Sequence, residues 1–372
     1  MKKLGVAGLC VCFVVAFAFA AEKEKGSAPK QDVWKQLNVK VGALIKLSAI
    51  FEDPHGKYSY APESHYGQTD NNHYFKVDHV FINIRGSFAK DFRFFVQPHY
   101  SQYLPGGGNV DAANMFVDYV RFPVKIRFGK FMYPGSIGAF TPASKMDFAT
   151  RPIMSAETAL PQCRDIGLML FGDVVKSKVA DRDLTVRLYA SVTNGKKPRN
   201  KGWPMGEGMM YTVRAEIHLG KLFSFGACYL KDYQEREWGQ VPIGAGIDHL
   251  QFSSVDATVS LGRIRIGGEF LQGWRVDDDA SYPDIEYDFQ GFYAKMFFRF
   301  CEYAEIGARY EVWDRRTDDK YETGVLTVGL NVLLNPKNPH AAKIQVNWRK
   351  VEEDNPDLKE GNTLQVLLQL CF

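Results

Sequence analysis

Basic residues recur at every second position of several short segments of this chain, as in Arg263-Ile264-Arg265-Ile266. Alternate side chains of an extended strand point to the same face, so these residues would line one surface. Assigning charged side chains by parity puts thirteen basic and seven acidic residues on that face. The basic set is Arg85, Arg93, Lys125, Arg127, Arg187, Arg214, Arg263, Arg265, Lys295, Arg299, Arg309, Lys343 and Arg349. The acidic set is Asp118, Asp165, Glu216, Asp256, Glu269, Glu305 and Glu311.

An excess of six positive charges on one face predicts the attraction of anions. Arginine also offers forked donors that suit carboxylate and phosphate. The alternative is that the arginines pair with the acids of the same face and only keep that face wet. Arg263 and Arg265 begin their segment and could lie at its rim.

Catalytic and metal-binding motifs are missing from the sequence. Ser101 and His99 share a parity, which leaves a lipid hydrolase as a remote alternative, but no nucleophile elbow or phosphate-binding glycine loop accompanies them. Three histidines, His55, His65 and His73, fall in one expected loop and are read as solvated rather than as metal ligands. The sequence therefore predicts no enzyme, no cofactor and no metal, and the scattered basic residues predict no nucleic-acid partner.

The N-terminal residues resemble an export signal. Lys2 and Lys3 precede an apolar stretch that runs to Phe19, and small residues follow at Ala20 and Ala21. We expect a signal peptide over 1–21, cleaved after Ala20 or Ala21, with a membrane anchor as the alternative, and a periplasmic leader over 22–38. Removing two lysines from 46 basic residues leaves 44 against 43 acidic residues, so the mature chain is nearly neutral.

From residue 39 onward the chain repeats one pattern, about ten residues of alternating polarity followed by a break. Such alternation without long apolar runs is typical of a transmembrane β-barrel. Sixteen strands are expected, at 39–51, 74–88, 92–103, 113–122, 124–133, 164–175, 182–193, 209–219, 222–231, 252–261, 263–274, 287–300, 302–314, 321–334, 341–350 and 363–372. Short connections alternate with long ones, as in an even-stranded barrel with both termini on one side.

A soluble β-sandwich also alternates polarity and is the structural alternative. Aromatic residues near strand ends favour the barrel, because they are typical of a membrane-interface girdle. They are Tyr100, Tyr103, Phe122, Tyr133, Trp274, Trp313 and Trp348. Four cysteines remain after export, Cys163, Cys228, Cys301 and Cys371, and are interpreted as isolated small apolar residues.

The segments around the fifth and sixth strands carry a family resemblance. Gly129-Lys-Phe-Met-Tyr-Pro134, Phe148-Ala-Thr-Arg-Pro-Ile153 and Arg164-Asp-Ile-Gly-Leu-Met-Leu-Phe-Gly172 resemble the phosphate-selective porin O and P family. The resemblance implies a sixteen-stranded trimeric barrel whose third external loop, here 134–163, folds into the pore. Phosphate-trapping members are rich in arginine along this loop. This loop carries Lys145 and Arg151, with Arg164 at its exit, beside Asp147 and Glu157.

Together these features predict an all-β barrel, over 39–372, in the bacterial outer membrane. The expected function is passive diffusion of small hydrophilic solutes, with a preference for anions and phosphate-like anions among them. A general non-selective porin and a structural or adhesive barrel are the alternatives. The partners expected are the solutes, outer-membrane lipid and two further copies of the chain in a homotrimer. Lys145, Arg151 and Arg164 are expected to join the wall cations in attracting solute.

Overall fold

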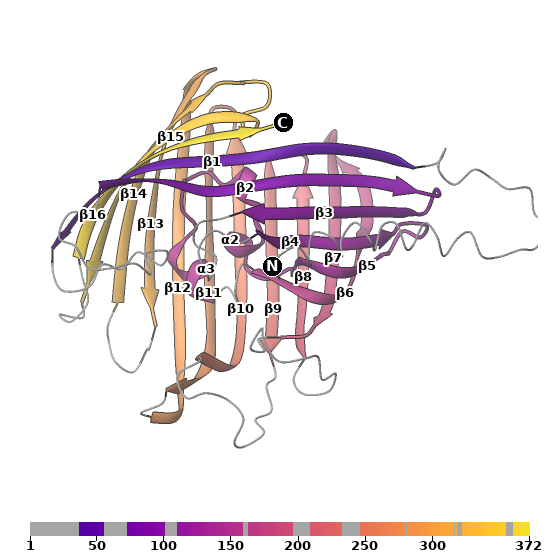
Figure 1. The fold of residues 1–372 in the computed structure, drawn as a ribbon, viewed down its shortest axis with the longest axis horizontal. Coiled ribbons are helices and arrows are strands. Elements are labelled where there is room, and N and C mark those ends of the chain that lie inside the picture. The colour runs from indigo at the N-terminus through magenta and orange to yellow at the C-terminus, as the bar shows by residue number, and fades with distance from the viewer. Residues whose placement is uncertain are drawn as a thin grey trace, which may run out of the picture. The chain divides into compact units, whose positions relative to one another are not determined.

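Sixteen antiparallel strands form a closed barrel in the computed structural model (Figure 1). The structure describes residues 37–55, 73–100, 110–158, 163–195, 209–232, 246–279, 282–315, 317, 322–354 and 360–372. The predicted signal peptide and nearly all of the predicted leader lie outside these residues and stay predictions. The barrel unit spans Asn38–Phe372, so the first strand begins one residue before its predicted start.

The strands follow the chain order around the barrel, and β1 closes it against β16. Their bounds are β1 Asn38–His55, β2 His73–Phe88, β3 Phe92–Tyr100, β4 Val110–Tyr119, β5 Lys125–Met132, β6 Arg164–Val179, β7 Arg182–Thr193, β8 Met210–Leu219, β9 Phe223–Asp232, β10 Gly246–Leu261, β11 Ile264–Asp279, β12 Tyr282–Cys301, β13 Ala304–Asp314, β14 Glu322–Leu333, β15 Ala342–Glu353 and β16 Glu360–Cys371. The predicted count and order are confirmed. The closure is in register from Leu44 opposite Cys371 to His55 opposite Glu360.

The two faces of each strand differ as the alternation requires. On β13, Glu305, Arg309 and Glu311 are buried, whereas Ile306 and Tyr310 between them are exposed on the outside. Each of the sixteen strands exposes at least one large apolar or aromatic side chain in this way. A continuous apolar outer surface around a polar interior is the pattern of a barrel whose outside meets lipid.

Register shifts in several strand pairs change this parity locally, and two of them lie on β1–β4. The β1–β2 register shifts between Lys46 and Leu47, and the β3–β4 register shifts between Gln97 and Pro98, where proline cannot donate to the ladder. An extra residue in one strand turns the following side chains to the opposite face. On β2 it brings both Lys76 and Asp78 to the inside, where they form a buried ion pair of 2.8 Å.

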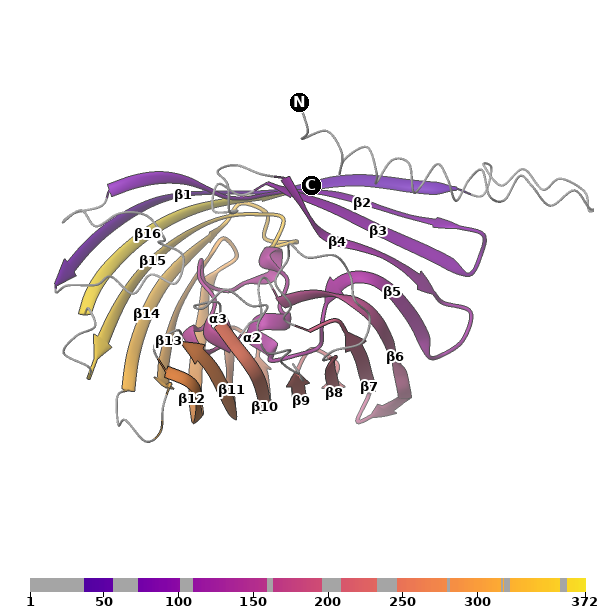
Figure 2. The same ribbon diagram turned by 60° about the horizontal axis from the view of Figure 1, so that its bottom comes forward.

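Short helices occupy the connection between β5 and β6. They are α2 Ile137–Phe140, the 3₁₀ helix η2 Ala143–Lys145 and α3 Ile153–Thr158. Figure 2 shows α2 and α3 within the ring of strands. Among the residues that the structure describes, no helix is both long and apolar enough to cross a membrane.

Two aromatic residues assigned to the membrane-interface girdle lie inside the barrel instead. Tyr133 and Trp313 are 1% and 0% exposed and belong to one apolar cluster with Ile153 and Met154 of α3. Trp313 has the same parity as Arg309 and Glu311, so its strand points it inward, and Tyr133 leads into the connection that enters the barrel. The assignment of these two residues was wrong. Tyr100, Phe122 and Trp348 are exposed, as expected for a girdle.

Candidate pore and anion site

The described residues of the connection from 133 to 163, here called the inserted segment, lie inside the barrel and hydrogen-bond to its wall. They are residues 133–158 and 163. Backbone N–H groups of Ile137 and Gly138, at the start of α2, donate to the Glu269 carboxylate of β11 at 2.8 and 3.1 Å. The N–H of Ile153, at the start of α3, donates to Glu311 of β13 at 2.6 Å. Helix N-termini have free N–H groups, which explains why wall carboxylates face both of them.

Four side chains of the wall bond to Asp147 of the inserted segment. Its carboxylate accepts from Arg265 Nη2 at 2.8 Å and from Lys295 Nζ at 2.7 Å. Its carbonyl oxygen accepts from the side-chain amides of Asn331 at 3.1 Å and Gln345 at 2.7 Å. Side chains from β11, β12, β14 and β15 thus converge on one residue. The anchor is therefore an acid of the inserted segment held by two cations of the wall.

The pKa of Asp147 follows from this environment. Burial alone would raise the pKa of its carboxyl, but the charges of Lys295 and Arg265 and the lysine hydrogen bond outweigh it. The result is a pKa lowered from 3.8 to about 2. Asp147 is therefore ionised throughout the neutral and mildly acidic range.

Five of the wall cations predicted to attract solute are ion-paired on β8 and β11–β13, and Arg265, which bonds Asp147, is one of them. Arg214 bonds Glu216 at 2.8 Å and Asp256 at 2.7 Å, and Arg309 bonds Glu311 at 2.7 Å. Lys295 bonds Asp147, and Arg299 lies 3.5 Å from Glu305. Arg309 also donates to the carbonyl oxygens of Thr150 and Arg151 at 3.1 and 3.3 Å. The structural alternative, that such residues pair with wall acids, describes Arg214, Arg299 and Arg309, whereas Lys295 and Arg265 bind Asp147 of the inserted segment.

A second group of predicted cations lies on β1–β5, near the short turns. Arg85 and Arg93 are exposed to the lumen, together with Lys40, which the parity assignment did not include. Within the part of the chain that the structure describes, no acidic side chain lies within ion-pair distance of these three residues. Lys125 and Arg127 are half-buried on β5. Arg127 bonds both carboxylate oxygens of Asp118, at 2.7 and 3.0 Å.

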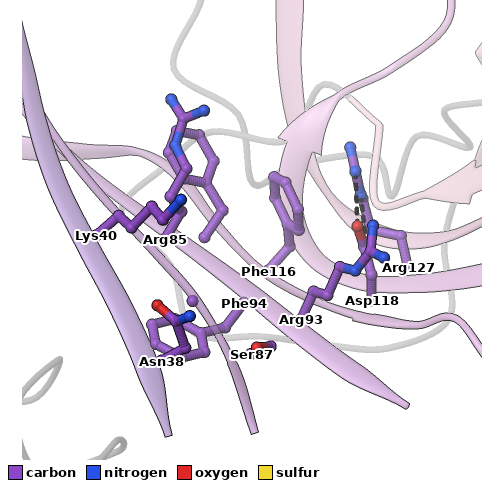
Figure 3. Close-up of a pocket in the computed structure, with 11 residues that line it drawn as sticks. Asn38, Lys40, Arg85, Ser87, Arg93, Phe94, Phe116, Asp118 and Arg127 are labelled. Carbon is purple, nitrogen blue, oxygen red and sulfur yellow. Dashed lines mark hydrogen bonds and ion pairs between the residues drawn. The ribbon is translucent and has the colours of Figure 1, made fainter. Parts of the chain in front are cut away.

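Lys40, Arg85, Arg93, Asp118 and Arg127 line a hollow of about 530 Å³, here called the basic recess (Figure 3). Its lining is Asn38, Lys40, Arg85, Gly86, Ser87, Arg93, Phe94, Phe95, Phe116, Asp118 and Arg127. In Figure 3, Lys40 and Arg85 lie on one side of the Phe116 ring, and Arg93, Asp118 and Arg127 lie on the other. Four cations against one carboxylate leave three positive charges in excess.

Aromatic rings accompany the cations of this wall. The Arg127 guanidinium lies 3.7 Å from the centroid of Phe116 and 5.0 Å from that of Phe171. Arg85 lies 5.4 Å from the centroid of Phe95, and Lys125 5.6 Å from that of Phe171. Cation–π contacts of this kind hold a cation in place without neutralising its charge.

The remaining predicted cations are spread over the interior. Arg187 on β7 bonds Asp173 and is partly exposed. Lys145 is exposed on the inserted segment, while Arg151 is half-buried and donates to the carbonyl oxygen of Gly138 within the same segment. Arg164 lies over the Phe81 ring at 5.9 Å. Arg263 lies in the turn before β11 and is exposed at the rim, as its position at the start of the segment suggested.

Several interior charged residues were missed from the sequence. Lys40 and Lys46 share the inward parity of β1, so a more complete count along that strand would have found them; Lys46 is 1% exposed. Lys76 and Asp78 were hidden by the bulge. Of the four cysteines in the barrel, Cys163 and Cys228 are buried, Cys371 is half-buried and Cys301 is exposed, and all four are unbridged.

The fold matches solved outer-membrane proteins along nearly its whole length. A loop-deletion variant of OmpT, an outer membrane protein of Vibrio cholerae, superimposes with a TM-score of 0.62 at 9% identity, over 91% of this chain and all of that one. The anion-selective porin from Comamonas acidovorans gives 0.62 at 9% identity, over 90% and 100%. Salmonella typhi OmpF in complex with daunomycin gives 0.60 at 11% identity, over 91% and 98%.

No family model and no curated protein matches the sequence. At 9–11% identity, the structural likeness establishes the sixteen-stranded porin fold and nothing finer.

Proposed function

We propose that the protein is an outer-membrane channel for passive diffusion of small hydrophilic solutes and that it prefers anions. The observation that carries the preference is the basic recess, where Lys40, Arg85 and Arg93 face the lumen together. A basic wall in a water-filled channel raises the local concentration of anions and repels cations. The proposal includes no catalysis and no cofactor.

The setting in the membrane is part of the proposal. An apolar outer surface on all sixteen strands supports insertion in the outer membrane, after export by the predicted signal peptide. Short turns would then face the periplasm, which puts the basic recess at the periplasmic mouth, while the inserted segment sets the size limit. We also propose a homotrimer, as the family resemblance implies.

We also propose that phosphate-like anions are among the solutes that the channel prefers. The resemblance of 129–172 to the phosphate-selective porins favours them, and the solved anion-selective porin shares the fold. The cations of this chain, however, gather on β1–β5 rather than along the inserted segment, which carries Lys145 and Arg151.

A general, weakly selective porin is the second candidate. It is favoured by the pairing of Arg214, Lys295, Arg299 and Arg309, because paired charges contribute little net potential to the lumen. Both candidate functions allow passive diffusion of small solutes, and they differ only in ion selectivity.

Swelling of liposomes that contain the purified protein tests diffusion itself. Vesicles loaded with a large sugar polymer should swell when small sugars are added outside, and the rate should fall steeply as the sugar grows. Empty vesicles are the control. Vesicles that do not swell in any small solute would contradict the channel and favour a structural barrel.

A further inference from the structure

We propose that the basic recess is a binding site for aryl carboxylates, meaning small organic anions with an aromatic ring attached to a carboxylate. The inference rests on the proposed function to the extent that such solutes reach the recess through the lumen. It goes further by naming a class of solute and the residues that recognise it.

Most of the positive charge of the recess is not neutralised by a neighbouring carboxylate. Arg127 is paired with Asp118 through its Nε and Nη2 atoms, but Lys40, Arg85 and Arg93 have no acidic partner within ion-pair distance among the described residues. A carboxylate entering here would meet an ammonium and two guanidinium groups. Charge-assisted hydrogen bonds to guanidinium groups are strong and directional.

Two aromatic rings also line the recess. Phe95 and Phe116 meet edge to face, with centroids 5.5 Å apart and an interplanar angle of 60°. Both rings line the recess and both are half-buried, so part of each remains open to solvent. Inorganic phosphate gains nothing from such rings. An aryl group gains both apolar burial and the favourable edge-to-face or stacked geometry of aromatic pairs.

The size of the recess agrees with this class of ligand. Its volume of about 530 Å³ lies within the range of about 300–1,000 Å³ typical of small-molecule sites. A site inside a channel must also release its solute, so weak binding is expected. Three unpaired cations beside two partly open rings therefore form a shallow site for a flat organic anion.

Calorimetric titration of the full-length protein in detergent would test the site with three probes. Benzoate, cyclohexanecarboxylate and inorganic phosphate separate the aromatic contribution from apolar area and from charge. We expect benzoate to bind about three- to tenfold more tightly than cyclohexanecarboxylate, which has the same charge and a similar size but no aromatic face. Equal affinity for these two carboxylates would overturn the proposal, as would tighter binding of phosphate than of benzoate.

Two variants assign the binding to the recess. Phe95→Leu should remove the preference for benzoate over cyclohexanecarboxylate and leave the weaker affinity in place. Arg85→Gln should weaken both carboxylates, whereas Arg182→Gln, at the exposed start of β7 outside the recess, should change neither. An unchanged preference in Phe95→Leu would overturn the assignment; should that variant not fold, Arg85→Gln and the wild-type comparison decide.

Failure of the site and failure of the channel give different results. Normal liposome swelling without a benzoate preference would remove only the aryl-carboxylate site. Benzoate binding without swelling would remove only the diffusion channel.

Discussion

The wall formed by β8 and β11–β16 and the wall formed by β1–β5 both carry arginine and lysine, but the two walls use them differently. On the first wall, Arg214 and Arg309 are 3% exposed and bond to carboxylates and to carbonyl oxygens of the inserted segment. On the second wall, Arg85 and Arg93 are exposed and face the lumen without an acidic partner among the described residues. The first set holds a segment in place, and the second set is free to meet solute.

The difference shows that inward parity alone does not make a cation a solute ligand. A guanidinium that finds a carboxylate and free carbonyl oxygens opposite it becomes a structural cross-link. One that finds only water and an aromatic ring keeps its charge available. The inserted segment creates the difference, because its helix ends and carbonyl groups supply partners along β11–β16.

The largest contrast between the walls should appear on removal of a buried cation. Arg309→Gln leaves Glu311 buried without its cation and leaves the carbonyl oxygens of Thr150 and Arg151 short of a donor. Loss of one partner from a buried ion pair costs about 3–5 kcal/mol. Urea-induced unfolding in lipid vesicles should show a decrease of this order in the free energy of unfolding.

Arg187→Gln on β7, which belongs to neither wall, is the matched control for a partly exposed ion pair. Its pair with Asp173 is partly exposed, with the arginine side chain 38% accessible, so the expected decrease is only about 0–1 kcal/mol. Equal losses in the two variants would contradict the anchoring role of Arg309.

A smaller effect is expected from Asp147→Asn, which keeps the shape of the side chain and removes its charge. Arg265 and Lys295 then lose their shared counterion, and hydrogen bonds to charged groups are worth about 1.5–3 kcal/mol. The inserted segment should be held less firmly, so single-channel recordings should show a larger and noisier conductance. The control is Glu352→Gln, which removes one partner of the exposed ion pair with Lys350 and should have the same single-channel conductance as the wild type.

Acid should reproduce part of the Asp147→Asn effect. The folded-state pKa of Asp147 is lowered from 3.8 to about 2, so its contribution to stability is fully present above about pH 4 and is lost as the pH falls toward 2. Single-channel conductance should therefore become noisier as the pH falls from about 4 to 2. The Asp147→Asn variant should lack this acid transition, and the same transition in that variant would contradict the anchoring role of Asp147.

Most of the fold could be predicted from the sequence because a barrel strand alternates strictly between lipid and water. The positions of sixteen strands and the inward direction of Arg309 or Glu305 follow from that alternation alone. Bulges could not be predicted, since one extra residue reverses parity without a strong local signal, as at Lys76 and Asp78.

The division of labour between the walls could not be predicted either. It depends on which wall the inserted segment contacts, and that is decided by tertiary packing of Tyr133, Ile153 and Met154 against Trp313. The sequence placed Asp147 in the segment but gave no sign that Arg265 and Lys295, more than a hundred residues away, would bind it.

The zero-current potential in a planar bilayer under a potassium chloride gradient tests the central claim most directly. We expect chloride preference for the wild type, because Lys40, Arg85 and Arg93 face the lumen unpaired. Removing two of these charges in Arg85→Gln/Arg93→Gln should lower the chloride-to-potassium permeability ratio by about two- to fivefold, as expected for screened charges at pore distances. Potassium preference in the wild type, or a ratio that the double variant leaves unchanged, would contradict the account.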